Sequence, residues 1–256
     1  MRIVRYRYQD KEGYGACEGS LLKIIEGDLW GDFKISDRTI LLKEVKVLPP
    51  VIPSKVVAVG LNYAMHVTEI AKDREVPKEP LLFMKPSTSI IGPDEKIVRP
   101  RKSDDLHYEG ELGVVMKRRA KGIETEEVQN YVLGYTCLND VTARDWQKKD
   151  GQWTRAKSFD TFCPIGPAIV TDIGNPNRLK IETRLNGEVK QSSVTSALLF
   201  KVEELVSYIS KNMTLLPGDI IATGTPEGVG PMVAGDIVEV EIEGIGTLRN
   251  GVVDEG

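Results

Sequence analysis

The sequence has no apolar run that approaches the roughly 18 residues of a membrane-spanning helix. Its N-terminal segment carries scattered charges without the apolar core of a secretory signal, so we expect no such signal. A basic excess is also missing, because 34 Lys and Arg residues stand against 38 Asp and Glu residues and the formal net charge is −4. Membrane and nucleic-acid partners are therefore disfavoured.

Cysteine is scarce as well. The three cysteines, Cys17, Cys137 and Cys163, lie far apart and form no C-x-x-C pair. An odd number at such spacings favours neither a disulfide framework nor a zinc site. We predict reduced thiols in a cytoplasmic protein.

Three closely spaced prolines, Pro49, Pro50 and Pro53, mark a stiff connector in which no helix can form. At 256 residues the chain is long enough for one sizeable core and a small appendage. We therefore predict a small N-terminal domain over residues 1–50 and a main domain over residues 51–256.

Short Val- and Ile-rich runs between glycine and proline turns dominate the main domain. Buried strands are predicted over 55–63, 81–92 and 108–116, and further runs of this kind alternate with turns in the final third. This spacing favours a mixed α/β, β-rich fold with antiparallel or mixed sheets over a regular βαβ repeat.

Two segments carry helical signals. Residues 125–135 begin with Thr125 as a suitable N-cap and place two valines four positions apart. Residues 201–213 place five apolar side chains on one stripe. We predict a helix in each.

The stretch "YEGELG" places Glu109 and Glu111 two apart on a predicted strand, and Asp140 ends another apolar run. Residues i and i+2 share one face of a strand, so two buried carboxylates would repel each other unless a cation lies between them. Three carboxylates form a hard, all-oxygen ligand set that suits Mg²⁺ or Mn²⁺, and less well Ca²⁺. Gly110 would face a tightly packed interior. The alternative is a solvent-facing glutamate pair and a helix-capping Asp140.

His66 and Glu69 lie three apart just after a predicted strand and turn. On a helical turn the carboxylate could orient the imidazole as a general base. A purely structural histidine is the alternative.

Lys157, in "WTRAKSFD", could pair with a bound anion or stabilise an enolate; otherwise it is a surface lysine over an apolar patch. The glycine-rich turn in "IIATGTPEGVGP" lacks the G-K-[ST] of a phosphate loop, but its amides and Thr225 could hold a carboxylate.

In this order, the segments "GLNYAMHVTE", "FMKPSTSIIGP", "YEGELGVV", "GYTCLNDVTARDWQ", "WTRAKSFDTFCPIGP" and "PGDIIATGTPEGVG" resemble the fumarylacetoacetate hydrolase family over about residues 55–230. The pattern is similar to that of acylpyruvate hydrolase and 2-hydroxyhepta-2,4-diene-1,7-dioate isomerase-like members. The resemblance implies a β-roll with a small, variable N-terminal domain, assembled as a homodimer.

The same resemblance implies three groups of site residues. The implied ligands of one divalent ion, Mg²⁺ or in some members Mn²⁺ or Ca²⁺, are Glu109, Glu111 and Asp140. The implied catalytic residues are His66 and Glu69, as a water-activating dyad, and Lys157 at the oxo-acid end of the substrate. The implied substrate-binding residues are Gln147, Thr225 and, in a supporting role, Lys85.

Family members act on 2-oxo acids or their enols. We predict a metal-dependent hydrolase that cleaves a carbon–carbon bond in acylpyruvate-like substrates of the fumarylacetoacetate or fumarylpyruvate type. The alternatives are an isomerase or decarboxylase of 2-hydroxyhepta-2,4-diene-1,7-dioate-type acids from aromatic catabolism, an oxaloacetate decarboxylase, or a non-catalytic metal-binding member. The residues that choose the substrate are expected in the segment after Tyr63, including 69–80, and in the small N-terminal domain.

Overall fold

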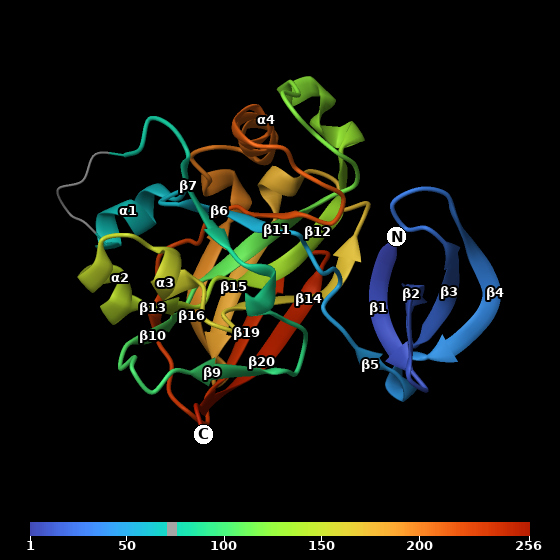
Figure 1. Cartoon of the computed structure of the whole chain (residues 1–256), viewed down its shortest axis with the longest axis horizontal. Coiled ribbons are helices and arrows are strands. Elements are labelled where there is room, and N and C mark those ends of the chain that lie inside the picture. The colour runs from blue at the N-terminus through green and yellow to red at the C-terminus, as the bar shows by residue number, and fades with distance from the viewer. Residues whose placement is uncertain (71–75) are drawn as a thin grey trace.

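Three β-sheets form the framework of the computed structural model, which describes residues 1–70 and 76–256 (Figure 1). Within these residues the largest sheet has 12 strands, and the other two have five and three. The β-rich, mixed fold that the sequence predicts is confirmed.

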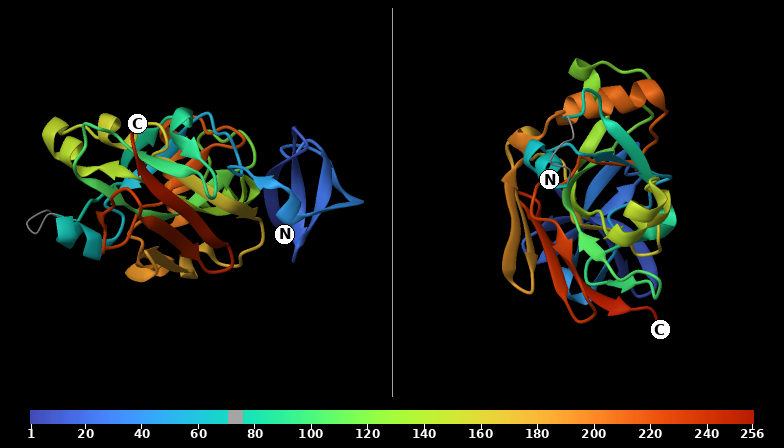
Figure 2. Two further views of the ribbon diagram at one scale, coloured as in Figure 1. Left: turned by 90° about the horizontal axis from the view of Figure 1, so that it is seen from below. Right: turned by 90° about the vertical axis from the view of Figure 1, so that its left-hand side faces the viewer.

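The first strands of the chain form one end of the largest sheet. They are β1 (Arg2–Tyr8), β2 (Lys11–Glu18), β3 (Leu21–Gly27) and β4 (Phe33–Leu41), with the short β5 (Lys46–Val47) beside β1. These strands lie together at one side of the molecule (Figures 1 and 2). The pairs Arg2↔Val170 and Ile3↔Ile169 join them to the remaining strands. Because they pair mainly with one another, we propose that residues 1–50 form a separate domain.

The sheet continues through the main part of the chain. From β1 its order is β14 (Cys163–Val170), β12 (Val132–Asn139), β11 (Gly110–Met116), β17 (Ile220–Ala222), β6 (Val56–Gly60) and β7 (Leu81–Lys85), and β8 (Ile90–Ile91) pairs with β14. Every residue of β11 is buried. An inner strand that is covered on both faces favours apolar residues, which fits the run "LGVVM" and leaves Glu111 as the charged residue of this strand.

Two smaller sheets complete the β-structure. The five-stranded sheet has the order β16 (Glu188–Val194), β15 (Lys180–Leu185), β19 (Ile237–Ile242), β20 (Gly246–Asp254) and β9 (Lys96–Arg99). The three-stranded sheet has the order β13 (Thr142–Ala143), β10 (Leu106–Tyr108) and β18 (Gly230–Pro231).

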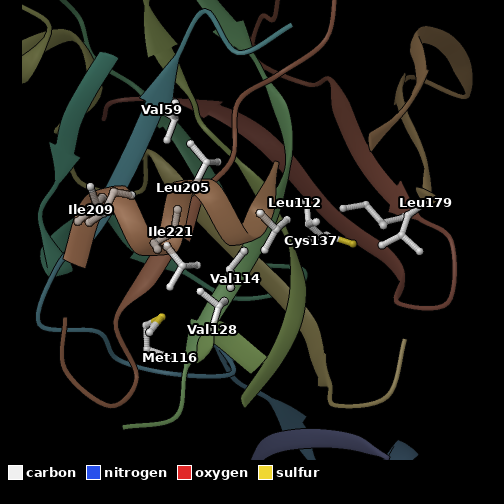
Figure 3. Packing of buried hydrophobic residues seen from close by; sticks show 14 of the residues in the cluster. Val59, Leu112, Val114, Met116, Val128, Cys137, Leu179, Leu205, Ile209 and Ile221 are labelled. Atoms are coloured by element: carbon white, nitrogen blue, oxygen red, sulfur yellow. The ribbon is translucent and has the colours of Figure 1, made fainter. Parts of the chain in front are cut away.

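The main core lies between the largest sheet, the five-stranded sheet and α4 (Val202–Asn212). Figure 3 shows Leu112 and Val114 of β11 pointing toward the same interior as Leu205 of α4. The five-stranded sheet contributes Ile181 and Val240. One face of β11 therefore packs in this core, which leaves Glu111 on the opposite face.

The helices are short. They are α1 (Ala64–Ile70), α2 (Arg144–Asp150), α3 (Thr154–Lys157) and α4, with 3-10 helices at Leu42–Glu44, Ser87–Ser89, Thr125–Asn130, Pro176–Arg178 and Thr195–Ala197. The predicted helix over 201–213 is confirmed by α4, whose buried side chains include Val202, Leu205, Val206 and Ile209.

The predicted helix over 125–135 is wrong beyond its first turns. A 3-10 helix covers Thr125–Asn130, with Glu124 and not Thr125 as its N-cap, and Val132 already belongs to β12. The valines at this junction are β-branched, and pairing of β12 between β11 and β14 outweighs the four-residue spacing.

A buried carboxylate ties the proline-rich connector to the start of β17. Asp219 is fully buried and accepts hydrogen bonds from Ser54 N at 3.1 Å and Ser54 Oγ at 2.6 Å. It also accepts from Leu216 N at 2.8 Å and pairs with the Lys55 ammonium. The entry into β6 is therefore held by side-chain contacts as well as by stiff prolines.

Cys17, Cys137 and Cys163 are free thiols, and the last two are buried. Among residues 1–70 and 76–256, no helix combines the length and the apolar character needed to cross a bilayer.

Candidate metal centre and active site

The three predicted carboxylates lie together where β10, β11 and β12 meet. Glu109 occupies the one-residue break between β10 and β11, and Asp140 follows the last residue of β12. Asp140 N donates to Glu109 O at 2.8 Å, which joins the two segments. One carboxylate oxygen from each of Glu109, Glu111 and Asp140 lies within 4.8 Å of the others, and all three residues are buried. The solvent-facing alternative is wrong for this cluster.

Gly110 separates the two glutamates because the opposite face has no room for a side chain. A Cβ atom at this position would lie 2.1 Å from Thr183 Oγ1 and 3.3 Å from Val240 Cγ1. Both neighbours belong to the five-stranded sheet. The predicted close packing at Gly110 is confirmed.

Three cationic side chains surround the cluster. Lys157 bridges two carboxylates, with its Nζ 2.8 Å from Glu109 Oε2 and 2.6 Å from Asp140 Oδ2. Lys85 donates to Asp140 Oδ1 at 2.5 Å, and Arg144 pairs with Glu109. Lys157 is almost entirely buried, so the surface-lysine alternative is wrong.

Burial and charge shift the three central pKa values in different directions. Burial alone would raise the pKa of Glu109, but the positive charges of Lys157 and Arg144 hold it below its ordinary value. The pKa of Glu111 is raised well above its ordinary value by burial and by the neighbouring charges of Asp140 and Glu109. Burial would lower the pKa of Lys157, yet Asp140 and Glu109 raise it.

These surroundings fit a divalent cation. Glu109 and Asp140 each have a cationic partner, whereas Glu111 accepts only the amide of Gly224, at 2.7 Å, among the described residues. A buried carboxylate with so little compensation is costly unless a positive charge approaches it. The all-oxygen donor set matches the preference of Mg²⁺ and Mn²⁺. The buried acidic triad therefore has the composition and spacing of a metal site.

A cavity of about 170 Å³ opens beside the cluster. Its walls include several predicted site residues: His66, Glu109, Glu111, Asp140, Gln147, Lys157 and Thr225. Phe83 and Trp153 add aromatic walls and contact each other edge to face. Lys85 does not line the cavity, because it lies fully buried behind Asp140.

His66 and Glu69 both lie on α1, as their spacing predicts. His66 Nδ1 is 3.1 Å from Glu69 Oε2, and the other carboxylate oxygen accepts from Gly228 N at 3.0 Å. When Nδ1–H donates to the carboxylate, Nε2 is left to accept a proton. Since His66 lines the cavity, the geometry suits a general base.

Sequence reasoning missed several residues that support the site. Arg144 holds Glu109 and also donates to Gln147 Oε1 at 2.6 Å. Its position three residues before Gln147 on one helix was a usable signal. Asn139 and Gln191 are further examples, since Asn139 Oδ1 accepts Glu109 N at 2.9 Å and Gln191 Oε1 accepts Gly110 N at 3.0 Å. Gln191 lies far away in the sequence, where no local pattern points to the site.

The segment 69–80, expected to help choose the substrate, is described only in part. Residues 71–75 lie outside the described residues, so the prediction is open for them.

Two family models match the chain. One, described as fumarylacetoacetate (FAA) hydrolase C-terminal, matches residues 55–253, and the other, described as Rv2993c-like, N-terminal, matches residues 1–50. A relative from Rattus norvegicus, named mitochondrial oxaloacetate tautomerase Fahd2a, is 48% identical over 82% of this chain and 70% of its own length.

Solved structures with the same fold include enzymes of two named classes. A 2-hydroxyhepta-2,4-diene-1,7-dioate isomerase from Mycobacterium marinum is 44% identical, with a TM-score of 0.92 over 100% of this chain and 99% of its own. A maleylpyruvate hydrolase from Sphingobium, in complex with manganese(II) and pyruvate, is 27% identical, with a TM-score of 0.83 over 100% of both chains.

Proposed function

This chain belongs to the fumarylacetoacetate hydrolase family, and on that premise we propose that it is a divalent-metal-dependent enzyme acting on small 2-oxo dicarboxylates. Its reaction is keto–enol or double-bond isomerisation by proton transfer, with oxaloacetate as the first substrate to test. Relatives at 44% and 48% identity are named an isomerase and an oxaloacetate tautomerase, whereas a solved structure named fumarylacetoacetate hydrolase is 36% identical and the manganese-bound maleylpyruvate hydrolase is 27% identical. We therefore place isomerisation ahead of the hydrolysis that the sequence alone favours.

The observation that carries this proposal is the charge balance around the acidic cluster. With a divalent ion bound, Glu109, Glu111 and Asp140 would carry three negative charges, and three cations, Lys85, Lys157 and Arg144, surround them. A divalent ion would leave two positive charges in a buried site. Such a site favours a dianion, because an opposite charge stabilises a buried charge most strongly where water is excluded. The small cavity also suits a short-chain acid.

The chain's own residues supply the remaining chemistry. A divalent ion held by Glu109, Glu111 and Asp140 would supply Lewis acidity toward the 2-oxo and 1-carboxylate oxygens. His66 Nε2 takes a proton from the carbon next to the oxo group, and Glu69 stabilises the imidazolium that forms. The electron pair of the broken C–H bond forms a carbon–carbon double bond, and the π electron pair of the carbonyl group moves to the oxo oxygen. Lys157 stabilises that developing negative charge, and protonation of the oxygen gives the enol.

This proposal is tested by following the ultraviolet absorbance of freshly dissolved oxaloacetate as its tautomers interconvert. We expect wild-type protein with Mg²⁺ to accelerate interconversion, and we expect EDTA or His66→Ala to abolish most of the acceleration. No acceleration with either Mg²⁺ or Mn²⁺, for oxaloacetate and for larger unsaturated 2-oxo dioates alike, contradicts the proposal.

Carbon–carbon hydrolysis is the second candidate, favoured by the His66–Glu69 pair, which could equally deprotonate a water molecule. It predicts metal-dependent release of pyruvate from acetylpyruvate or fumarylpyruvate. Decarboxylation of oxaloacetate also releases pyruvate but requires no attacking water, so activity that survives His66→Ala would indicate decarboxylation. We further propose that the protein is a cytoplasmic homodimer. Gel filtration with light scattering measures its assembly state.

A further inference from the structure

Gln191 is a buried amide that connects two parts of the site without lining the cavity. It lies on β16 and is 1% exposed. Its Oε1 accepts the amide of Gly110 at 3.0 Å, and its Nε2 donates to Thr225 Oγ1 and to Pro226 O, both at 2.8 Å. One side chain thus joins the peptide between the two glutamates to the loop that carries Thr225.

The three contacts determine the direction of each hydrogen bond. Gly110 N–H can only donate and Pro226 C=O can only accept, so the amide orientation of Gln191 is unambiguous. The second Nε2 hydrogen must then go to Thr225, whose oxygen accepts it. Within residues 1–70 and 76–256, the Thr225 hydroxyl has no protein acceptor for its own proton.

The residue that carries this proton borders the cavity. Thr225 is 3% exposed and lines the cavity together with the acidic triad and Lys157. The Thr225 hydroxyl already accepts one hydrogen bond, and a buried hydroxyl of this kind is satisfied when it also donates its proton to an acceptor. The strongest acceptor in a site of this charge is a carboxylate oxygen of the ligand.

We propose that Gln191 is a positioning residue that holds the Thr225 hydroxyl as a donor toward the carboxylate of a bound 2-oxo acid. The inference rests on the proposed function for the class of ligand. It predicts that the outer strand β16 sets carboxylate affinity from outside the cavity. Because the same amide accepts Gly110 N–H, the carboxylate-binding loop and the metal-binding strand share one support.

The test is calorimetric titration of oxalate into Mg²⁺-loaded protein, which needs no turnover. Gln191→Glu retains an acceptor for Gly110 N–H but supplies no amide hydrogens, so the Thr225 hydroxyl turns to donate to the new carboxylate. We expect oxalate affinity to fall about tenfold or more, the usual effect of losing a hydrogen bond to a charged group. Thr225→Val should cause a similar loss, and Thr225→Ser should retain near wild-type affinity.

The double variant decides whether Gln191 acts through Thr225. If it does, Gln191→Glu with Thr225→Val binds oxalate no more weakly than either single variant, because both remove the same contact. Gln191→Met, which adds no charge, should give the same non-additive result. Asn250→Asp is the matched control, since Asn250 is a buried amide that bonds Gly92 O and Glu95 O and does not line the cavity. We expect unchanged oxalate affinity for it.

Three results would overturn the inference: unchanged oxalate affinity in both Gln191 variants, losses that multiply in the double variant, or no oxalate binding by the wild type. Equal weakening of Mg²⁺ binding in Gln191→Glu, which retains the acceptor for Gly110 N–H, would indicate general damage and also count against it. Oxaloacetate tautomerisation is assayed separately. Non-additive oxalate binding without that activity would leave the positioning role standing and refute the proposed function.

Discussion

Gly110→Ala should damage both the stability of the protein and its metal site. The added Cβ would lie 2.1 Å from Thr183 Oγ1, and real Cβ contacts below 3.0 Å are essentially unknown, so one of the two must move by about 0.9 Å. Both strands are paired on each side, which leaves little freedom for that shift. Overpacking of this kind costs about 1–3 kcal/mol. Displacement of β11 should also weaken Mg²⁺ binding by Glu109 and Glu111.

A second substitution separates this clash from other effects. Thr183 Oγ1 is buried without a hydrogen-bond partner in the described residues, so Thr183→Ala alone should change stability little. With that oxygen removed, the next neighbours of a Cβ atom at position 110 lie 3.3 Å away. We expect Thr183→Ala to recover most of the stability and Mg²⁺ affinity lost in Gly110→Ala. Thr183→Val, which keeps the branch, should not.

Urea unfolding monitored by circular dichroism and Mg²⁺ titration calorimetry measure the two effects. Gly113→Ala on the same strand is the control, because its closest neighbour is Thr136 Cγ2 at 3.0 Å. The loss of stability in Gly113→Ala should be smaller than that in Gly110→Ala, and adding Thr183→Ala should not change it. The reasoning would be refuted by a Gly110→Ala variant as stable as wild type, or by a loss that Thr183→Ala leaves unchanged.

Three further predictions concern the buried charges. Glu111→Gln should stabilise the metal-free protein at neutral pH and abolish stabilisation by Mg²⁺. Because the folded-state pKa of Glu111 is raised, the wild type should lose stability relative to this variant as the pH rises above 4.5. Melting temperatures of the two proteins that change in parallel with pH would contradict this prediction. Lys85→Met leaves Asp140 with one cation and should cost about 3–5 kcal/mol in urea unfolding, so a near-neutral result would show that Lys157 alone suffices. Asp219→Ala removes the contacts to Ser54, Lys55 and Leu216 and should lower the free energy of unfolding in urea by about 3 kcal/mol or more. A decrease below about 1 kcal/mol would show that the prolines alone hold the connector.

Local sequence patterns predicted the parts of the site that lie on single elements. The spacing of Glu109 and Glu111, and that of His66 and Glu69, place each pair on one strand segment or one helical turn, and both pairs are found there. The proximity of Asp140 to the two glutamates follows only from the order of several motifs along the chain, because local spacing does not show which strands are neighbours.

What local patterns could not predict arises from distant contacts. The local spacing assigns Val132 to a helix, whereas its strand conformation in β12 depends on pairing with β11 and β14. Gln191 reaches Gly110 only through the packing of the five-stranded sheet against β11. The family resemblance assigns Lys85 only a supporting role, whereas its full burial against Asp140 makes it part of the charge balance around the acidic cluster. Such contacts depend on tertiary packing, which no window of the sequence contains.

A crystal structure with Mn²⁺ and oxalate tests the central claim most directly, because the anomalous scattering of manganese identifies the ion. The account predicts one strong anomalous peak bound by Glu109, Glu111 and Asp140, with oxalate in the adjoining cavity beside Lys157 and Thr225. An anomalous peak elsewhere, or an acidic cluster neutralised by Lys157 alone under saturating Mn²⁺, would contradict it.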